Sequence, residues 1–216
     1  MTNKLKQKEN YQYQLPLGSL PKIFRNSYND FRKTRKGYLK PDRKRTFALR
    51  KELGIYGKKV IGISWKSFNS NNMFKKNLEL KSIMNILNKE NVFILNLQYG
   101  DVHKEISKFN QNNSNKVHTC SSVNNEDDLD GLASLIDICD LVVSTSNITI
   151  HLSGALNKKT WVLLPYVTEF WWFLDRSDSP WYPSLKLYRQ KSVGSWTEPL
   201  SELEHDFDEW LSNKTV

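Results

Sequence analysis

Short apolar runs alternate with stretches of helical spacing from residue 58 to the end of the chain. The runs predict strands at residues 60–64, 92–97, 117–120, 141–143, 161–164 and 185–188. Between them, apolar residues recur at every third or fourth position and predict helices near residues 78–87, 105–109, 127–139, 148–156 and 200–211. The connections are too long for hairpins, so the alternation predicts an α/β fold: an open parallel sheet with helices on both faces.

The stretch from residue 140 to 164 is the most regular part of this pattern. An apolar run leads into four small polar residues at 144–147, a short helix follows, and a second apolar run closes the unit. Strand, polar turn, helix and strand in this order form a βαβ unit, which places ligands at the turn between strand and helix. His151 lies one helical turn beyond the polar residues, within reach of a ligand bound there.

The first quarter of the chain differs from the rest in charge. Residues 1–60 hold 17 Lys and Arg against 4 Asp and Glu, whereas residues 61–216 hold 15 against 19. A helix that starts at about Asp42 leads into the regular pattern. We therefore expect residues 1–57 to be a basic linker or the remnant of an N-terminal domain, and residues 58–216 to form a Rossmann-like domain with a C-terminal helix.

The composition argues against several classes of protein. No apolar run approaches the roughly 20 residues of a membrane span, and the polar N-terminus lacks the apolar stretch of a secretory signal. The basic segment has no RNA-binding signature and no heptad repeat, so we expect no nucleic-acid partner. Cys120 and Cys139 are expected to be buried free thiols, as is typical of a cytosolic protein. We expect a cytoplasmic protein, either free or peripheral at the inner membrane face.

Polar turns follow four of the predicted strands, and in a parallel sheet such turns meet at one edge. Ligands bind at this edge in open α/β sheets, so its polar side chains are the candidate binding residues. They are Ser64, Lys66, Gln98, Tyr99, Ser144, Ser146, Asn147 and Thr149, joined by His151. The helix after residue 147 offers free amides and the positive end of its dipole to a diphosphate. Ordinary capping of that helix by Ser or Asn is a second interpretation. For His151, the second interpretation is a histidine at the edge of the core, bonded to a backbone carbonyl.

Charged and aromatic residues supply further candidates. Lys66, Lys75 and Lys76 carry point charges suited to a phosphate. The segment LDRSDSPWYP combines Asp175 and Arg176 with aromatic neighbours, which suits stacking on a base or a sugar; a packed loop that anchors the last helix is the other interpretation. Neither a GxGxxG nor a Walker sequence follows the first strand, which argues against a dinucleotide cofactor and a P-loop NTPase. No carboxylate pair or histidine cluster indicates a metal site.

Two long runs resemble a known family: DLDGLASLIDICDLVVSTSNITIHLSGALNKKTWVLLPY and WWFLDRSDSPWYPSLKLYRQ. Together they resemble the C-terminal domain of GT-B glycosyltransferases. They are most similar to the heptosyltransferase-like enzymes of glycosyltransferase family nine, and to bacterial versions of these enzymes fused to tetratricopeptide repeats. The resemblance covers residues 58–212, and QLPLGSLPKIF resembles the segment that ends the N-terminal domain of those fusions.

The resemblance implies a domain that binds a nucleotide-diphosphate sugar as donor, and transfer of the sugar with inversion and without a metal or other cofactor. In that family an Asp-Thr pair before the helix and a histidine on it contact the donor. These positions correspond to Ser146, Asn147 and His151, with serine in place of the aspartate. The family's phosphate-binding lysine falls at Lys75 or Lys76, and Asp128 is expected near the base or ribose.

The resemblance also implies a partner domain. In such enzymes the acceptor site and the general base belong to an N-terminal Rossmann domain, of which this chain holds at most the last segment. We therefore expect the chain to act with an N-terminal acceptor domain, in cis or in trans, and to be inactive alone. A non-catalytic binding or scaffold module derived from such an enzyme is the alternative, and the serine at position 146 favours it.

Overall fold

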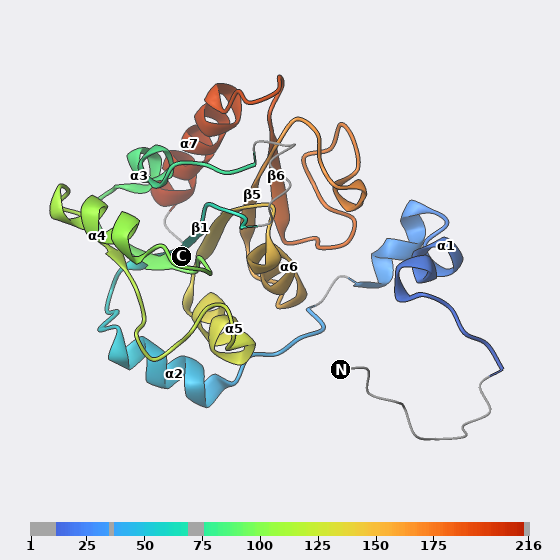
Figure 1. The fold of residues 1–216 in the computed structure, drawn as a ribbon, viewed down its shortest axis with the longest axis horizontal. Helices are drawn as coiled ribbons and strands as arrows, with labels where there is room; N and C mark the ends of the chain where they lie inside the picture. Colours follow the sequence, from blue (N-terminus) through green and yellow to red (C-terminus); the bar gives the residue numbers. More distant parts are fainter. Residues whose placement is uncertain (1–11, 35–36, 69–75, 214–216) are drawn as a thin grey trace. The chain divides into compact units, whose positions relative to one another are not determined.

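The computed structural model describes residues 12–34, 37–68 and 76–213. The chain divides into two compact units, one up to Lys33 and one from Thr34 onward. The described part of the first unit holds short helices: η1 (Leu17–Ser19), α1 (Leu20–Phe24) and η2 (Tyr28–Thr34), the last of which ends at the boundary. The second unit carries the sheet and the remaining helices (Figure 1).

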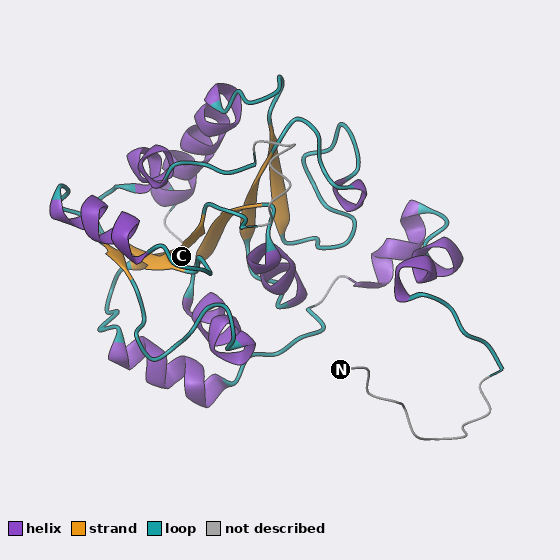
Figure 2. Ribbon diagram, viewed as in Figure 1, coloured by secondary structure: helices purple, strands orange, loops and turns teal. Residues whose placement is uncertain are grey.

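A six-stranded parallel sheet with the order β3-β2-β1-β4-β5-β6 forms the centre of the second unit (Figure 2). Its strands are β1 (Lys59–Ser64), β2 (Val92–Asn96), β3 (Val117–His118), β4 (Leu141–Thr145), β5 (Thr160–Leu164) and β6 (Leu185–Arg189). The open parallel α/β sheet predicted from the apolar runs is thus confirmed. β3 is shorter than the predicted 117–120, because it is an edge strand that pairs only with β2.

Helices cover both faces of the sheet. In Figure 1, α3 and α7 lie on one side of the strands, and α5 and α6 lie on the other. The helices of this unit are α2 (Arg43–Glu52), α3 (Leu80–Leu87), α4 (His103–Gln111), α5 (Leu129–Ile138), α6 (Ile148–Ala155) and α7 (Thr197–Ser212), with a 3-10 turn, η4 (Phe170–Trp172). Among the described residues, no helix is long and apolar enough to cross a membrane.

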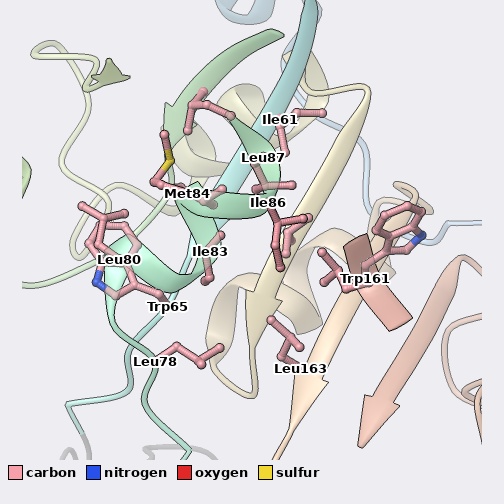
Figure 3. Close-up of a cluster of buried hydrophobic side chains, with 14 of the residues drawn as sticks. Ile61, Trp65, Leu78, Leu80, Ile83, Met84, Ile86, Leu87, Trp161 and Leu163 are labelled. Carbon is pink, nitrogen blue, oxygen red and sulfur yellow. The ribbon is translucent and has the colours of Figure 1, made fainter. Parts of the chain in front are cut away.

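Alternating strand side chains build a separate core on each face. Ile61 and Ile63 of β1 pack in the cluster that contains the apolar side of α3 (Figure 3). Val60 of β1 faces the opposite way and packs with α5. Cys120 and Cys139 are free and buried, as predicted; Cys139 belongs to the α5 core. Because β1 is covered on both faces, its sequence between Lys59 and Ser64 is a continuous apolar run rather than an alternation.

The segment before β1 is bonded to the helices of the sheet unit. The backbone amides of Tyr38 and Leu39 donate to the Ala155 carbonyl at the end of α6, at 2.9 and 3.1 Å. Asp42 then caps α2, as its position in the sequence predicts, by accepting from the amides of residues 44 and 45. On the next turn, the Arg45 guanidinium forms a two-point ion pair with Asp128 at the start of α5.

The strand order reverses between β1 and β4, and this reversal positions the candidate site. From β1 the chain moves outward to β2 and β3, then returns to place β4 on the other side of β1. Ser64 and Ser144 are opposite each other in the register of these two strands. Such a reversal point is the usual ligand site of open parallel sheets, because the loops that leave the two strands part in opposite directions.

Gly62 of β1 lies where the residues that follow β2 and α5 pack tightly on the sheet. A Cβ atom at this position would lie 2.3 Å from the Leu97 side chain and 2.7 Å from the Cys139 sulfur. We expect Gly62→Ala to lower the free energy of unfolding by about 1–3 kcal/mol, the usual cost of overpacking a core. Urea denaturation measures this loss. Gly18→Ala, where nothing lies within 4 Å of the added atom, is the control; equal stabilities for the two variants would contradict the packing described.

Candidate functional site

A buried group of polar side chains joins the ends of β1, β2 and β4; we call Ser64, Gln98, Ser144 and Asn147 the switch-point lock. The Asn147 amide donates through Nδ2 to the Ser64 hydroxyl (2.7 Å) and to the Lys66 carbonyl (3.2 Å). Its Oδ1 accepts from the backbone amide of Thr149 (3.0 Å) and so caps α6. One side chain thus ties the loop after β1 to the start of α6.

Gln98 holds the same loop from the β2 side. Its Oε1 accepts from the Ser64 hydroxyl at 3.1 Å and from the backbone amides of Trp65 and Lys66, both at 2.8 Å. Its Nε2 donates to the carbonyls of Lys66 (3.2 Å) and Tyr99 (2.9 Å). Gln98 is 2% exposed, and both ends of its amide are satisfied within the protein. The lock is therefore a buried polar network whose hydrogen bonds hold the loop after β1 at residues 64–66.

Several candidates from the sequence belong to this support. Ser64, Ser144 and Thr149 are fully buried, and the Thr149 hydroxyl donates to the Leu97 carbonyl at 3.4 Å. Ser144 donates to its neighbour's carbonyl at 2.9 Å and lies 3.4 Å from the Asn147 Oδ1. The capping of α6, one of two interpretations of the polar turn, is confirmed. A contact between these three side chains and a donor stays a prediction.

Tyr99 fixes the outer part of the loop after β1. Its hydroxyl accepts from the Phe68 amide at 3.3 Å, and the Phe68 ring packs edge-on against the Tyr99 ring at 5.7 Å between centroids. Gly100, with φ of +76°, lies under the Phe68 ring, where any Cβ would clash. Phe68 is the last described residue before position 76, so these contacts place the start of that loop over β2.

A second group of polar side chains lies beside the lock; we call Ser146, Glu169, Lys76 and Trp172 the Ser146 cluster. The Ser146 hydroxyl donates to Glu169 Oε2 at 3.1 Å and accepts from the Trp172 indole N–H at 2.9 Å. Lys76 Nζ pairs with the other Glu169 oxygen at 3.2 Å. Lys75, the other lysine expected near a phosphate, lies outside the described residues.

His151 lies against the same tryptophan. Its ring stacks on Trp172 with 5.4 Å between centroids and 20° between planes, and its Nδ1 lies 3.3 Å from the Tyr182 hydroxyl. The Tyr182 ring packs over Gly154 one turn further along α6, and its hydroxyl bonds the Tyr38 side chain. Burial lowers the pKa of His151, and the charge of Glu169 offsets part of that shift. His151 is therefore a neutral, oriented imidazole at neutral pH.

Two charged candidates have partners on other helices. Lys66 Nζ forms an ion pair with Glu105 of α4 at 2.6 Å. Asp128 caps α5 by accepting from the Gly131 amide at 2.9 Å, and its bonds to Arg45 hold its pKa below the ordinary value. Both carboxylate oxygens of Asp128 thus have protein donors. Its expected contact with the base or ribose of a donor stays a prediction, as does the phosphate contact of Lys66.

Asp175 and Arg176 lie apart from both groups, in the loop between η4 and β6. Together with Arg189 and Gln190 they line a cavity of about 720 Å³ beside β6. Arg176 pairs with Asp178 at 2.7 Å, and the Arg189 guanidinium donates to the backbone carbonyls of Arg176 and Trp172. The second interpretation of this segment, a packed loop, thus describes its local structure. The last helix, α7, packs against α3 on the opposite face of β5, and this loop takes no part in that contact.

Glu169 is the site residue that the sequence did not indicate, because it lies 23 positions after Ser146 along the chain. Trp172 and Tyr182 are among the aromatic neighbours of Asp175 and Arg176 that the sequence offered for stacking on a base or a sugar, but their contacts with Ser146 and His151 were not predicted. Only the parallel pairing of β4 with β5 brings the loop after β5 to the start of α6. In the described part of the chain, no group of three or more His, Cys, Asp or Glu side chains could hold a metal ion.

Known proteins of similar structure share this sheet. The chain superposes on ADP-heptose lps heptosyltransferase II of E. coli with a TM-score of 0.60 and 12% sequence identity, over 82% of this chain and 54% of that one. It superposes on a glycosyl transferase family 9 protein of Veillonella parvula with a TM-score of 0.57 and 9% identity, over 81% and 52% of the two chains. The chain thus has a GT-B Rossmann-like fold.

One sequence relative is Protein FlbA of Caulobacter vibrioides, which is 27% identical over 190 residues. The match covers 87% of this chain and 31% of that protein, so the chain spans about a third of the relative's length and about half the length of the two transferases. No family model matches the chain. The comparisons therefore establish the fold.

The buried histidines make the stability of the fold depend on pH. Burial lowers the pKa of His151 and of His118 from the ordinary value of 6.5. Below that pH the unfolded chain takes up protons that the folded chain does not, so the free energy of unfolding is greatest above pH 6.5 and falls as the pH decreases further. We expect His151→Gln, which cannot titrate, to reduce the slope of this loss in urea titrations between pH 7 and 5. An unchanged slope would contradict the burial of a neutral His151.

Proposed function

We propose that this chain is the donor-binding half of a glycosyltransferase that takes its sugar from a nucleotide diphosphate. The observation that carries the proposal is the Ser146 cluster with His151, which gathers a cation, a carboxylate, a hydroxyl and a neutral imidazole at the start of α6. These groups come from three separate segments of the chain. The GT-B fold supports the proposal, because the two solved structures compared above are both glycosyltransferases of this fold.

The start of α6 is the proposed place for the diphosphate. Ile148, the first helical residue, is 50% exposed, and an N–H at this position has no acceptor within its own helix. The helix dipole adds a partial positive charge, and Lys76 adds a full one nearby. The neutral imidazole of His151 supplies a hydrogen-bond donor through Nε2 when its Nδ1 accepts from Tyr182.

These donors would also act during transfer. When the bond between the anomeric carbon and the phosphate oxygen breaks, negative charge develops on the leaving diphosphate, and oriented N–H groups and a lysine stabilise it. A metal is not needed for this role. We propose transfer with inversion, as the family resemblance implies, with the acceptor and the general base supplied by a separate N-terminal domain in cis or in trans.

A non-catalytic binding module of the same fold is the second candidate function. The replacement of the family's aspartate by Ser146 favours it. An assay of sugar transfer with a panel of nucleotide sugars, in the presence of the proposed acceptor domain, separates the two. Transfer activity would exclude the module, whereas nucleotide-sugar binding without transfer would favour it.

His151→Ala tests the proposed site directly. We expect the affinity for a nucleoside diphosphate to fall roughly 10-fold, because one hydrogen bond to a charged group is lost. Calorimetric titration with ADP, GDP, UDP and CDP measures the change, and thermal unfolding checks that the fold is intact. Tyr182→Phe keeps the ring over Gly154 but removes the hydroxyl, and should cause a smaller loss.

His205→Ala is the matched control, because His205 is an exposed histidine on α7 far along the chain from the site. Its affinity should equal that of the native chain. Unchanged affinity in His151→Ala would show that the imidazole does not contact the nucleotide.

A further inference from the structure

Glu169 is an unexpected group in a site that otherwise offers hydrogen-bond donors. Its carboxylate comes from the loop after β5 and reaches the start of α6, where Ser146 donates to one oxygen and Lys76 to the other. Its side chain is 23% exposed, so part of the carboxylate faces solvent. A second loop thus brings negative charge to the place where the helix dipole is positive.

A diphosphate alone does not account for this carboxylate. Like charges a few ångströms apart repel, so a carboxylate beside a diphosphate is unfavourable. A carboxylate is instead a strong acceptor for hydroxyl hydrogens, with which it forms short, charge-assisted bonds. Neutral polyhydroxylated ligands are therefore the chemistry that Glu169 fits, and a sugar attached to the diphosphate is such a ligand.

The surroundings of Glu169 hold it in one orientation. The Trp172 indole is fully buried and donates to Ser146, which fixes the direction in which the serine hydroxyl hydrogen points. That hydrogen is directed at Glu169 Oε2, while Lys76 is bonded to Oε1. Each carboxylate oxygen accepts more than one hydrogen bond, so both oxygens keep capacity for ligand hydroxyls.

Lys76 is the second partner of the carboxylate. Its side chain is 14% exposed, and its ammonium group offsets the negative charge that a diphosphate would otherwise meet. Lys76 carries three N–H donors and can hold Glu169 with one of them while another meets a phosphate oxygen. The ion pair thus separates two adjacent subsites, one for an anion and one for hydroxyl groups.

We propose that Glu169 determines donor specificity by accepting hydrogen bonds from hydroxyl groups of the transferred sugar, with Ser146 and Lys76 as the residues that position it. This rests on the proposed function. Ser146 leaves the turn after β4 without an acidic side chain. In this proposal, Glu169 from the loop after β5 supplies the carboxylate that binds the sugar hydroxyls.

Glu169→Gln tests the proposal through a ratio of affinities. Calorimetry would compare each of ADP, GDP, UDP and CDP with its glucose or mannose conjugate in the native chain and the variant. We expect the affinity for the preferred conjugate to fall about 10- to 100-fold, the effect of losing hydrogen bonds to a charged group. The affinity for the free nucleoside diphosphate should be unchanged or higher, because a negative charge has been removed.

Lys76→Met distinguishes this role from simple charge pairing. If Glu169 only held Lys76 in place, the two variants would lose affinity for nucleotide and conjugate alike, and the proposal would be wrong. We expect Lys76→Met to weaken both ligands and Glu169→Gln to weaken the conjugate alone. Asp208→Asn, which breaks another lysine ion pair on α7, is the control and should leave both affinities unchanged.

The outcomes also separate this proposal from the function on which it rests. If the native chain bound none of these nucleotides or conjugates, the proposed function and the role of Glu169 would both fall. If it bound them and Glu169→Gln left the ratio of affinities unchanged while remaining folded, only the role of Glu169 would fall.

Discussion

The buried amide of Asn147 is the interaction on which the candidate site depends. It spans the reversal point of the sheet, bonding the hydroxyl of Ser64 at 2.7 Å on one side and capping α6 on the other. Because a buried amide without hydrogen-bond partners costs free energy, arrangements of these loops that break the Asn147 bonds are disfavoured. Gln98 completes the same arrangement from β2. Hydrogen bonds thus join residues 64–66 at the end of β1 to the start of α6.

The adjacent residues Ser146 and Asn147 have different partners at this turn. Asn147 bonds to the loop after β1 and caps α6, whereas Ser146 bonds to Glu169 and Trp172. The partly exposed groups of the cluster thus rest on a layer whose own hydrogen bonds are satisfied. His151 connects the lock with the Ser146 cluster. It lies on α6, which Asn147 caps, and its ring stacks on the Trp172 indole that bonds to Ser146. Such support holds binding groups in one geometry before a ligand arrives.

Local pattern was sufficient to predict the sheet, because each buried strand is a short apolar run and each helix has an apolar side. The capping of α2 by Asp42 and the free thiols also followed from local chemistry. The site was predicted only in outline. Polar residues after strands were found, but those that support loops, such as Gln98, look the same in sequence as those that face a ligand. Glu169 depends on strand order, and the pairing of Asp128 with Arg45 joins residues 83 positions apart, which periodicity does not predict.

The most direct test of this account is a nitrogen–proton NMR titration of the chain with nucleoside diphosphates and their sugar conjugates. The Trp172 indole N–H donates to Ser146, and the Ile148 amide begins α6, so both report on the proposed site at the start of α6. We expect a nucleoside diphosphate to shift the Ile148 signal and its sugar conjugate to shift the Trp172 indole signal as well. Shifts confined to the groove of about 800 Å³ between α4 and the loop after β3, with both of these signals unmoved, would contradict it.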